Sequence, residues 1–263
     1  MKRRNIDVHA HIFPAKIVEK ATGAIGEFYH VSIDGKGSSK DLIKHGGRIG
    51  TEKYVVHSVA TKPEQVGTIN RFIREEVAAH PEFCGFATLH PLMKDMEKEI
   101  ELAIEGGMRG IKLHPDFQRF YIDEDSSIEM YKKIDNSLPI LMHMGDERTD
   151  FSKPRRLARV IDMLPEKTFI GAHFGGYSDW DEAKEYLIGK RDLYIDTCSS
   201  LFKLPAEEAV DMIRMHGVDK VLFGTDYPMW LPEKEFALFL NLDLTEEERD
   251  LILCQNADKL LFQ

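Results

Sequence analysis

The histidines of this chain gather at positions where chemistry is expected. Seven of the eleven lie at or just after the C-terminal end of a predicted β-strand. These seven are His9, His11, His57, His90, His114, His143 and His173. Imidazole nitrogens bind divalent metal ions and move protons near neutral pH. A single histidine at such a position more often fills a core or hydrogen-bonding role, but seven at one edge of a fold indicate a functional site.

The segment Asp7–His11, with the sequence DVHAH, carries the sharpest signal. Residues two apart on a strand share a face and lie about 6.6–6.8 Å apart along it, so His9 and His11 can converge on one ion. Metal–nitrogen bonds of about 2.0–2.1 Å, further ligands and an open position for water would complete a zinc site. His143 and Asp226, at the ends of two later strands, supply a third imidazole and a carboxylate. The sequence therefore predicts a divalent metal site.

Eight short apolar and β-branched runs must position these residues, and segments with helical spacing lie between them. The predicted strands are Ile6–His9, Tyr54–Ser58, Gly85–Leu89, Gly110–His114, Ile140–His143, Phe169–His173, Leu193–Asp196 and Val221–Thr225. From the second strand on, they begin roughly 24 to 30 residues apart, the length of a strand, a helix and two loops. Strands that alternate with helices pair in parallel through right-handed crossovers. The pattern predicts an α/β fold, an eight-stranded parallel (β/α)8 TIM-type barrel.

The interval between the first two strands is longer than the others. Its excess, about residues 23–50, includes the glycine- and serine-rich stretch DGKGSSKD and is predicted to form an insertion or lid. No linker divides the chain, so residues 1–263 are predicted to form one domain. In such a barrel the C-terminal strand ends form the active face, where the seven histidines would meet.

Composition excludes several classes of protein. The chain has 263 residues, of which 43% are hydrophobic and 30% charged, so it can form a large core and is not disordered throughout. Its net charge of −10 disfavours binding to nucleic acid and to anionic lipid. No apolar run reaches the ~18 residues of a membrane span, and the three dispersed cysteines do not make a disulfide framework. We expect a reduced, cytoplasmic protein without membrane or nucleic-acid partners.

Several segments resemble the amidohydrolase superfamily, and within it the amidohydrolase-related (amidohydrolase 2) branch that includes aminocarboxymuconate semialdehyde decarboxylase. They are, in order, IDVHAHIFP, GIKLHPDFQRF, LPILMHMG, FIGAHFGG, LYIDTCSS, VLFGTDYP and QNADKLLF. The resemblance runs from residue 6 to the C-terminus and is weakest in the stretch after the first strand. It implies a metal-dependent enzyme built on the predicted barrel.

The resemblance also implies a role for each matching residue. His9, His11 and His143 would bind the metal ion. Asp226 would bind it as well and would handle a proton of the metal-bound water. His173 would act beside the water or substrate as an acid/base or electrostatic partner. Asp226 and His173 are therefore the predicted catalytic residues.

Lys112 bears on the number of metal ions. Superfamily members with two ions bridge them with a carboxylated lysine at the end of strand four, and there the equivalent of His173 binds the second ion. Alternation along the strand puts Lys112 and His114 on one side, so both could face the site. This branch more often resembles single-metal sites, so one ion is favoured over two, with Lys112 tied to an acidic group. Zn²⁺ is the favoured metal, with Mn²⁺ as the alternative.

Arg48, Arg119 and Arg148 are assigned to loops of the predicted active face. A guanidinium grips a carboxylate with two hydrogen bonds, and the resemblance implies carboxylate substrates. With His114, these arginines are the predicted substrate-binding residues, and a small carboxylate-bearing molecule is the predicted partner. A homodimer is expected by analogy with other barrels of the superfamily.

Two reactions suit such a site. The leading hypothesis is a metal-dependent hydrolase of a small organic acid, amide or lactone, in which a metal-activated water attacks the substrate. The alternative is a non-oxidative decarboxylase of an unsaturated or aromatic carboxylic acid. A TatD-type deoxyribonuclease also begins with an H-x-H strand, but it would carry a glutamate where this chain has GIKLH. A barrel that binds a metal or small acid without turnover is the non-catalytic alternative.

Overall fold

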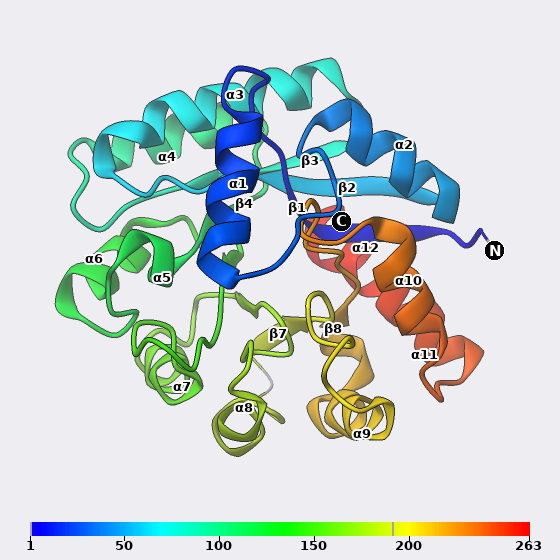
Figure 1. The fold of residues 1–263 in the computed structure, drawn as a ribbon. Helices are drawn as coiled ribbons and strands as arrows, with labels where there is room; N and C mark the ends of the chain where they lie inside the picture. Colours follow the sequence, from blue (N-terminus) through cyan, green and yellow to red (C-terminus); the bar gives the residue numbers. More distant parts are fainter. Residues whose placement is uncertain (1, 191) are drawn as a thin grey trace.

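The structure is a computed structural model that describes residues 2–190 and 192–263. Eight parallel strands follow one another around a single sheet in the order β1 to β8, with helices around them (Figure 1). The strands are β1 Asn5–His11, β2 Thr51–His57, β3 Phe83–Thr88, β4 Gly110–Leu113, β5 Ile140–Met142, β6 Phe169–Gly171, β7 Leu193–Asp196 and β8 Val221–Leu222.

Backbone hydrogen bonds between β1 and the chain around β8 close the sheet. Val8 N donates to Phe223 O at 3.0 Å, and Asp226 N donates to His9 O at 2.8 Å. The predicted (β/α)8 barrel is therefore confirmed. The later strands β5, β6 and β8 are short, and all of their residues are buried because both faces of a parallel sheet are covered.

The helices fill the intervals between the strands and follow the last one. They are α1 Val18–Tyr29, α2 Ser39–Ile49, α3 Val66–Ala79, α4 Met96–Glu105, α5 Pro115–Gln118, α6 Asp125–Lys133, α7 Pro154–Met163, α8 Trp180–Tyr186, α9 Ala206–His216, α10 Pro232–Leu240, α11 Glu246–Asp250 and α12 Asn256–Leu261. Shorter helical turns are η1 Pro63–Gln65, η2 Val218–Lys220 and η3 Leu251–Gln255. None of these helices is long and apolar enough to cross a membrane.

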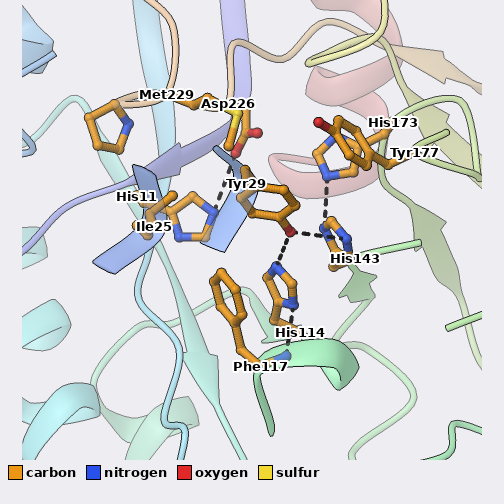
Figure 2. A pocket seen from close by; sticks show the side chains of 11 residues that line it. His11, Ile25, Tyr29, His114, Phe117, His143, His173, Tyr177, Asp226 and Met229 are labelled. Carbon is orange, nitrogen blue, oxygen red and sulfur yellow. Dashed lines mark hydrogen bonds and ion pairs between the residues drawn. The ribbon is translucent and has the colours of Figure 1, made fainter. Parts of the chain in front are cut away.

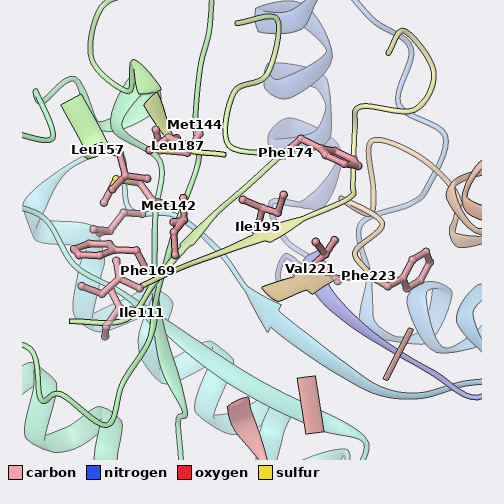
Figure 3. Close-up of a cluster of buried hydrophobic side chains, with 14 of the residues drawn as sticks. Ile111, Met142, Met144, Leu157, Phe169, Phe174, Leu187, Ile195, Val221 and Phe223 are labelled. Carbon is pink, nitrogen blue, oxygen red and sulfur yellow. The ribbon is translucent and has the colours of Figure 1, made fainter. Parts of the chain in front are cut away.

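Alternate residues of β2, β5, β6 and β8 pack into two separate apolar layers. Ile140 and Met142 of β5 belong to the larger layer, whereas Leu141 between them belongs to the smaller one. Figure 3 shows part of the larger layer. The smaller layer also takes in Leu261 of α12, and Arg4 pairs with Asp258 of the same helix at 2.9 Å. Because Arg4 directly precedes β1, α12 lies at the N-terminal end of the strands and leaves the opposite end for the site.

The segment between β1 and β2 differs in detail from the predicted insertion over residues 23–50. Helix α2 lies beside α10 and β2, with Leu42 and Ile49 buried, so it serves as the helix of the first β/α unit. The additional element is α1 with the loop that follows it. None of the α1 residues is buried, and the helix lies across the front of the barrel (Figure 1).

Candidate active site

Two strand ends bring three predicted metal ligands together. Oδ1 of Asp226, which follows β8, lies 3.4 Å from Nε2 of His9 and 3.5 Å from Nε2 of His11, both on β1. Two donors bound at 2.0–2.1 Å to a tetrahedral ion are about 3.3 Å apart. The spacing of these donors therefore fits one divalent ion held between them.

The ring of His9 is oriented for this role. Its Nδ1 donates to Oδ2 of Asp196, which ends β7, at 2.7 Å, so the lone pair of Nε2 faces the site. Lys112 Nζ donates to that lone pair at 3.0 Å, which shows that the position already attracts a cation. Burial lowers the pKa of Lys112 to about 8, although the Asp226 and Asp196 carboxylates oppose this shift. The donor set thus suits a positive ion.

Asp226 is held as an ionised carboxylate. Burial alone would raise its pKa, but the hydrogen bond from His11 and the nearby His9 and His173 outweigh burial and hold the pKa well below its ordinary value. Ser199 Oγ donates to its other oxygen at 2.5 Å. The φ angle of +55° at Asp226 lies in the left-handed region, which aspartate tolerates better than most residues. One carboxylate oxygen of Asp226 therefore faces the histidines, while the hydrogen bond from Ser199 holds the other in place.

Beneath this set, Cys198 lies between two of the histidines. Its Sγ lies 3.2 Å from Nδ1 of His9 and 3.3 Å from Nδ1 of His173. Burial, with Asp196 next, raises the pKa of the thiol well above its ordinary value, so the thiol stays protonated. The 2.7 Å between His9 and Asp196 is also too short for two ligands of one tetrahedral ion, which need about 3.3 Å. This group is a hydrogen-bonded support of the site.

His143 and His173 form a second part of the site. Nδ1 of His143 and Nε2 of His173 lie 3.0 Å apart, and Nε2 of His143 lies 3.1 Å from Gly145 O. The His143 ring is stacked on that of His114, with centroids 3.8 Å apart and planes 8° apart. The possible metal-binding atoms of His143, His114 and Asp116 lie within 4.8 Å of one another. His143 was predicted to join His9 and His11 instead, and it does not form such a group with them in this structure. Nε2 of His114 and Nε2 of His143 both face the hydroxyl of Tyr29, at 3.0 Å and 3.4 Å.

A small pocket opens onto these residues (Figure 2). Its lining residues are His11, Ile25, Tyr29, His114, Phe117, His143, His173, Tyr177, Asp226, Pro228 and Met229. The cavity measures about 30 Å³, which is room for one water molecule. Tyr29 of α1 closes it, since the Tyr29 hydroxyl lies 3.0 Å from Nε2 of His114 and 3.4 Å from Nε2 of His143.

The three predicted substrate-binding arginines lie outside this lining. Arg48 is in the last turn of α2, directly before β2, which places it toward the N-terminal end of the strands. Its guanidinium pairs with Glu233 at 2.9 Å. Arg119 follows α5 and is exposed. Arg148 pairs with Asp146 and donates to Phe28 O at 2.5 Å, which holds the end of α1. Of the predicted substrate-binding residues, only His114 lines the pocket.

Sequence reasoning missed two polar residues of the site. Tyr29 lies in α1, and the residue spacing in this helix does not indicate that the helix packs over the strand ends. No sequence signal therefore identified Tyr29. Ser199 follows β7 by three residues, and its place after the predicted strand was a usable signal. His57 was counted among the histidines at the strand ends but was assigned no role.

Solved structures share this fold over nearly their whole length. The 5-carboxyvanillate decarboxylase of Sphingomonas paucimobilis is 14% identical with a TM-score of 0.73, and 98% of each chain is covered. The dihydroxybenzoic acid decarboxylase of Polaromonas sp. JS666, with bound manganese and the inhibitor 2-nitroresorcinol, is 17% identical with a TM-score of 0.73, and 99% of this chain and 97% of that chain are covered. A proposed 2-pyrone-4,6-dicarboxylic acid hydrolase of Pseudomonas putida is 16% identical with a TM-score of 0.69, covering 97% and 96%.

These identities are low, so the structural matches by themselves show the fold alone. None of the curated proteins compared with the chain matches it. The family model described as Amidohydrolase, in contrast, matches residues 6–263, from the start of β1 to the last residue. That match covers every ligand and pocket residue described above, and by it the chain belongs to the amidohydrolase family.

Proposed function

We propose that the protein is a metal-dependent decarboxylase that removes carbon dioxide from a small unsaturated or aromatic carboxylic acid. The observation that carries this proposal is the wall of the pocket. Flat rings of His114, Phe117, His143 and Tyr177 surround a space that meets the Asp226 carboxylate. Such walls suit a planar conjugated substrate, because aromatic groups prefer stacked and edge-to-face contacts.

The residues of the chain divide the work between them. A divalent ion held by His9, His11 and Asp226 would supply a Lewis acid that anchors and polarises the oxygens of the substrate. Decarboxylation breaks the bond to the carboxylate carbon, leaves the electron pair on the substrate and requires a proton there. Asp226 is the one carboxylate among the described lining residues, so it takes a proton from the substrate or water and returns it to that carbon. His173, 3.0 Å from His143, positions the reacting group and can pass a proton on.

The similar structures support this choice without deciding the substrate. Two of those described above bear the name of a decarboxylase, and one of the two holds manganese. We therefore take one ion as the working model, with manganese or zinc as the metal and a carboxylate-bearing molecule as the ligand. The homodimer and the cytoplasmic location expected from the sequence stay predictions.

Hydrolysis is the second candidate, and the sequence slightly favoured it. The observation in its favour is that the cavity beside the ionised Asp226 has room for one water molecule. A carboxylate in that place can accept a proton from an attacking water. We place it second because the ring-lined pocket suits a flat substrate and offers no further groups that select an amide or lactone.

Product analysis separates the two reactions. Protein loaded with manganese or zinc would be incubated with hydroxybenzoates and unsaturated diacids, and released carbon dioxide would be measured, alongside amide and lactone substrates. We expect carbon dioxide from at least one acid, and its loss in Asp226→Asn. Asp219→Asn, which changes an acid of η2 away from the pocket, is the matched control. Turnover of a lactone or amide without any carbon dioxide would overturn the proposal in favour of hydrolysis.

A further inference from the structure

One buried histidine beside the metal ligands has no task in the site described so far. His57 is the last residue of β2 and lies in register with His11 on the neighbouring strand β1. Its ring centroid lies 4.4 Å from that of His11 at an angle of 89°, and 5.0 Å from that of His9 at 68°. His57 is fully buried. The ring is therefore enclosed next to two of the three donors that fit an ion.

Neither ring nitrogen of His57 has a hydrogen-bond partner among the described residues. Buried polar atoms are almost always paired, because an unpaired one loses its contact with water and gains nothing in return. His9, His114, His143 and His173 all have such partners. A neutral imidazole has one nitrogen that donates a hydrogen bond and one that offers a lone pair to a metal ion.

A nitrogen of His57 lies close to the nitrogens of the predicted ion site. One nitrogen each from His9, His11 and His57 lie within 4.8 Å of one another. Ligands on opposite sides of an ion with bonds of 2.0–2.1 Å are about 4.2 Å apart, so a small movement of the rings brings all three nitrogens to one ion. An ion shared by the three imidazoles would satisfy the atom that the protein leaves unpaired. We propose that His57 is a further ligand of the metal ion held by His9, His11 and Asp226, an inference that rests on the proposed metal centre.

X-ray absorption spectroscopy of the zinc-loaded protein tests this assignment, because it counts the imidazoles bound to the ion independently of activity. The variant is His57→Leu, and the matched control is His90→Leu. His90 also follows a strand end and is buried, but its Nδ1 already accepts a hydrogen bond from Leu92 N at 3.2 Å. We expect one imidazole fewer in His57→Leu, a zinc affinity at least tenfold weaker in competition with a chelator, and neither change in the control.

Other outcomes are equally decisive. An unchanged imidazole count in His57→Leu would overturn direct ligation even if the affinity falls, since His57 would then act through its neighbours or through a water molecule. If His57→Leu does not fold, as judged by circular dichroism, His57→Phe provides the same count with a ring of similar shape. If the wild-type protein binds zinc but His57 is not among the ligands, this inference alone is overturned. If the wild-type protein binds neither zinc nor manganese, the proposed function is overturned with it.

Discussion

Replacing Tyr29 should open the active site. With Tyr29 in place the cavity holds about one water molecule, so every organic substrate requires this side chain to move. The hydrogen bond to His114 contributes about 1 kcal/mol. The edge contact with Tyr177 and the tilted contact with Phe117 together contribute about 1–2 kcal/mol. The closed position is therefore favoured by about 2–3 kcal/mol, which corresponds to an open fraction roughly 30- to 160-fold smaller than the closed one.

Chemical labelling measures this opening without any knowledge of the substrate. Diethyl pyrocarbonate acylates neutral imidazoles, and peptide mass spectrometry would follow its reaction with His114. We expect Tyr29→Ala to accelerate that reaction by about 30- to 160-fold. Tyr29→Phe keeps the ring and loses only the hydrogen bond, so it should accelerate the reaction by about fivefold. Tyr186→Ala, which changes an exposed tyrosine of α8, is the control. An unchanged rate in Tyr29→Ala would refute the reasoning.

Three further changes test the site and the fold. Asp196→Asn should weaken metal affinity by about 10- to 100-fold in competition with a chelator, because it loosens the orientation of His9, and equal affinity would contradict this. Asn70→Ala should lower the free energy of unfolding in urea by about 2–5 kcal/mol, because it leaves the buried N–H and C=O of Thr88 unpaired, and a loss below about 1 kcal/mol would contradict this. Burial lowers the pKa of His216 to about 4, so between pH 6.5 and 4 the unfolded chain binds a proton that the native protein does not. Stability should fall with decreasing pH in that window by up to about 1.4 kcal/mol per pH unit, and His216→Gln should flatten the slope in urea unfolding at pH 7, 6 and 5.

The barrel was predictable because its signals are local and repeated. Each strand is a short apolar run, and regular spacing between runs left one plausible architecture. The helix α2 was missed because the glycine- and serine-rich stretch DGKGSSKD, within which it begins, was interpreted as part of an insertion. The structure explains why α2 itself contains a glycine at position 46. A Cβ at Gly46 would lie 2.3 Å from the hydroxyl of Tyr54, so packing against β2 excludes any side chain there.

The site was predictable only as far as the strand ends determine it. His9, His11 and Asp226 meet because backbone positions on neighbouring strands place them together. The ring of His143 turns toward His173, because side-chain torsions follow local packing rather than strand spacing. Arg48 was assigned to the active face only because its helix had been read as a loop.

The choice between the two reactions depends on α1, the element that sequence patterns described least well. Hydrolysis requires a water molecule to remain beside Asp226 while the substrate is bound. Decarboxylation has no step in which water attacks the substrate, so it does not need that water to stay in place. Ile25 of α1 and Met229 bring apolar side chains to the lining of the pocket, and Tyr29 leaves room for about one water. A flat substrate that displaces the Tyr29 ring would take that water's place, and this consequence of the lid geometry favours decarboxylation.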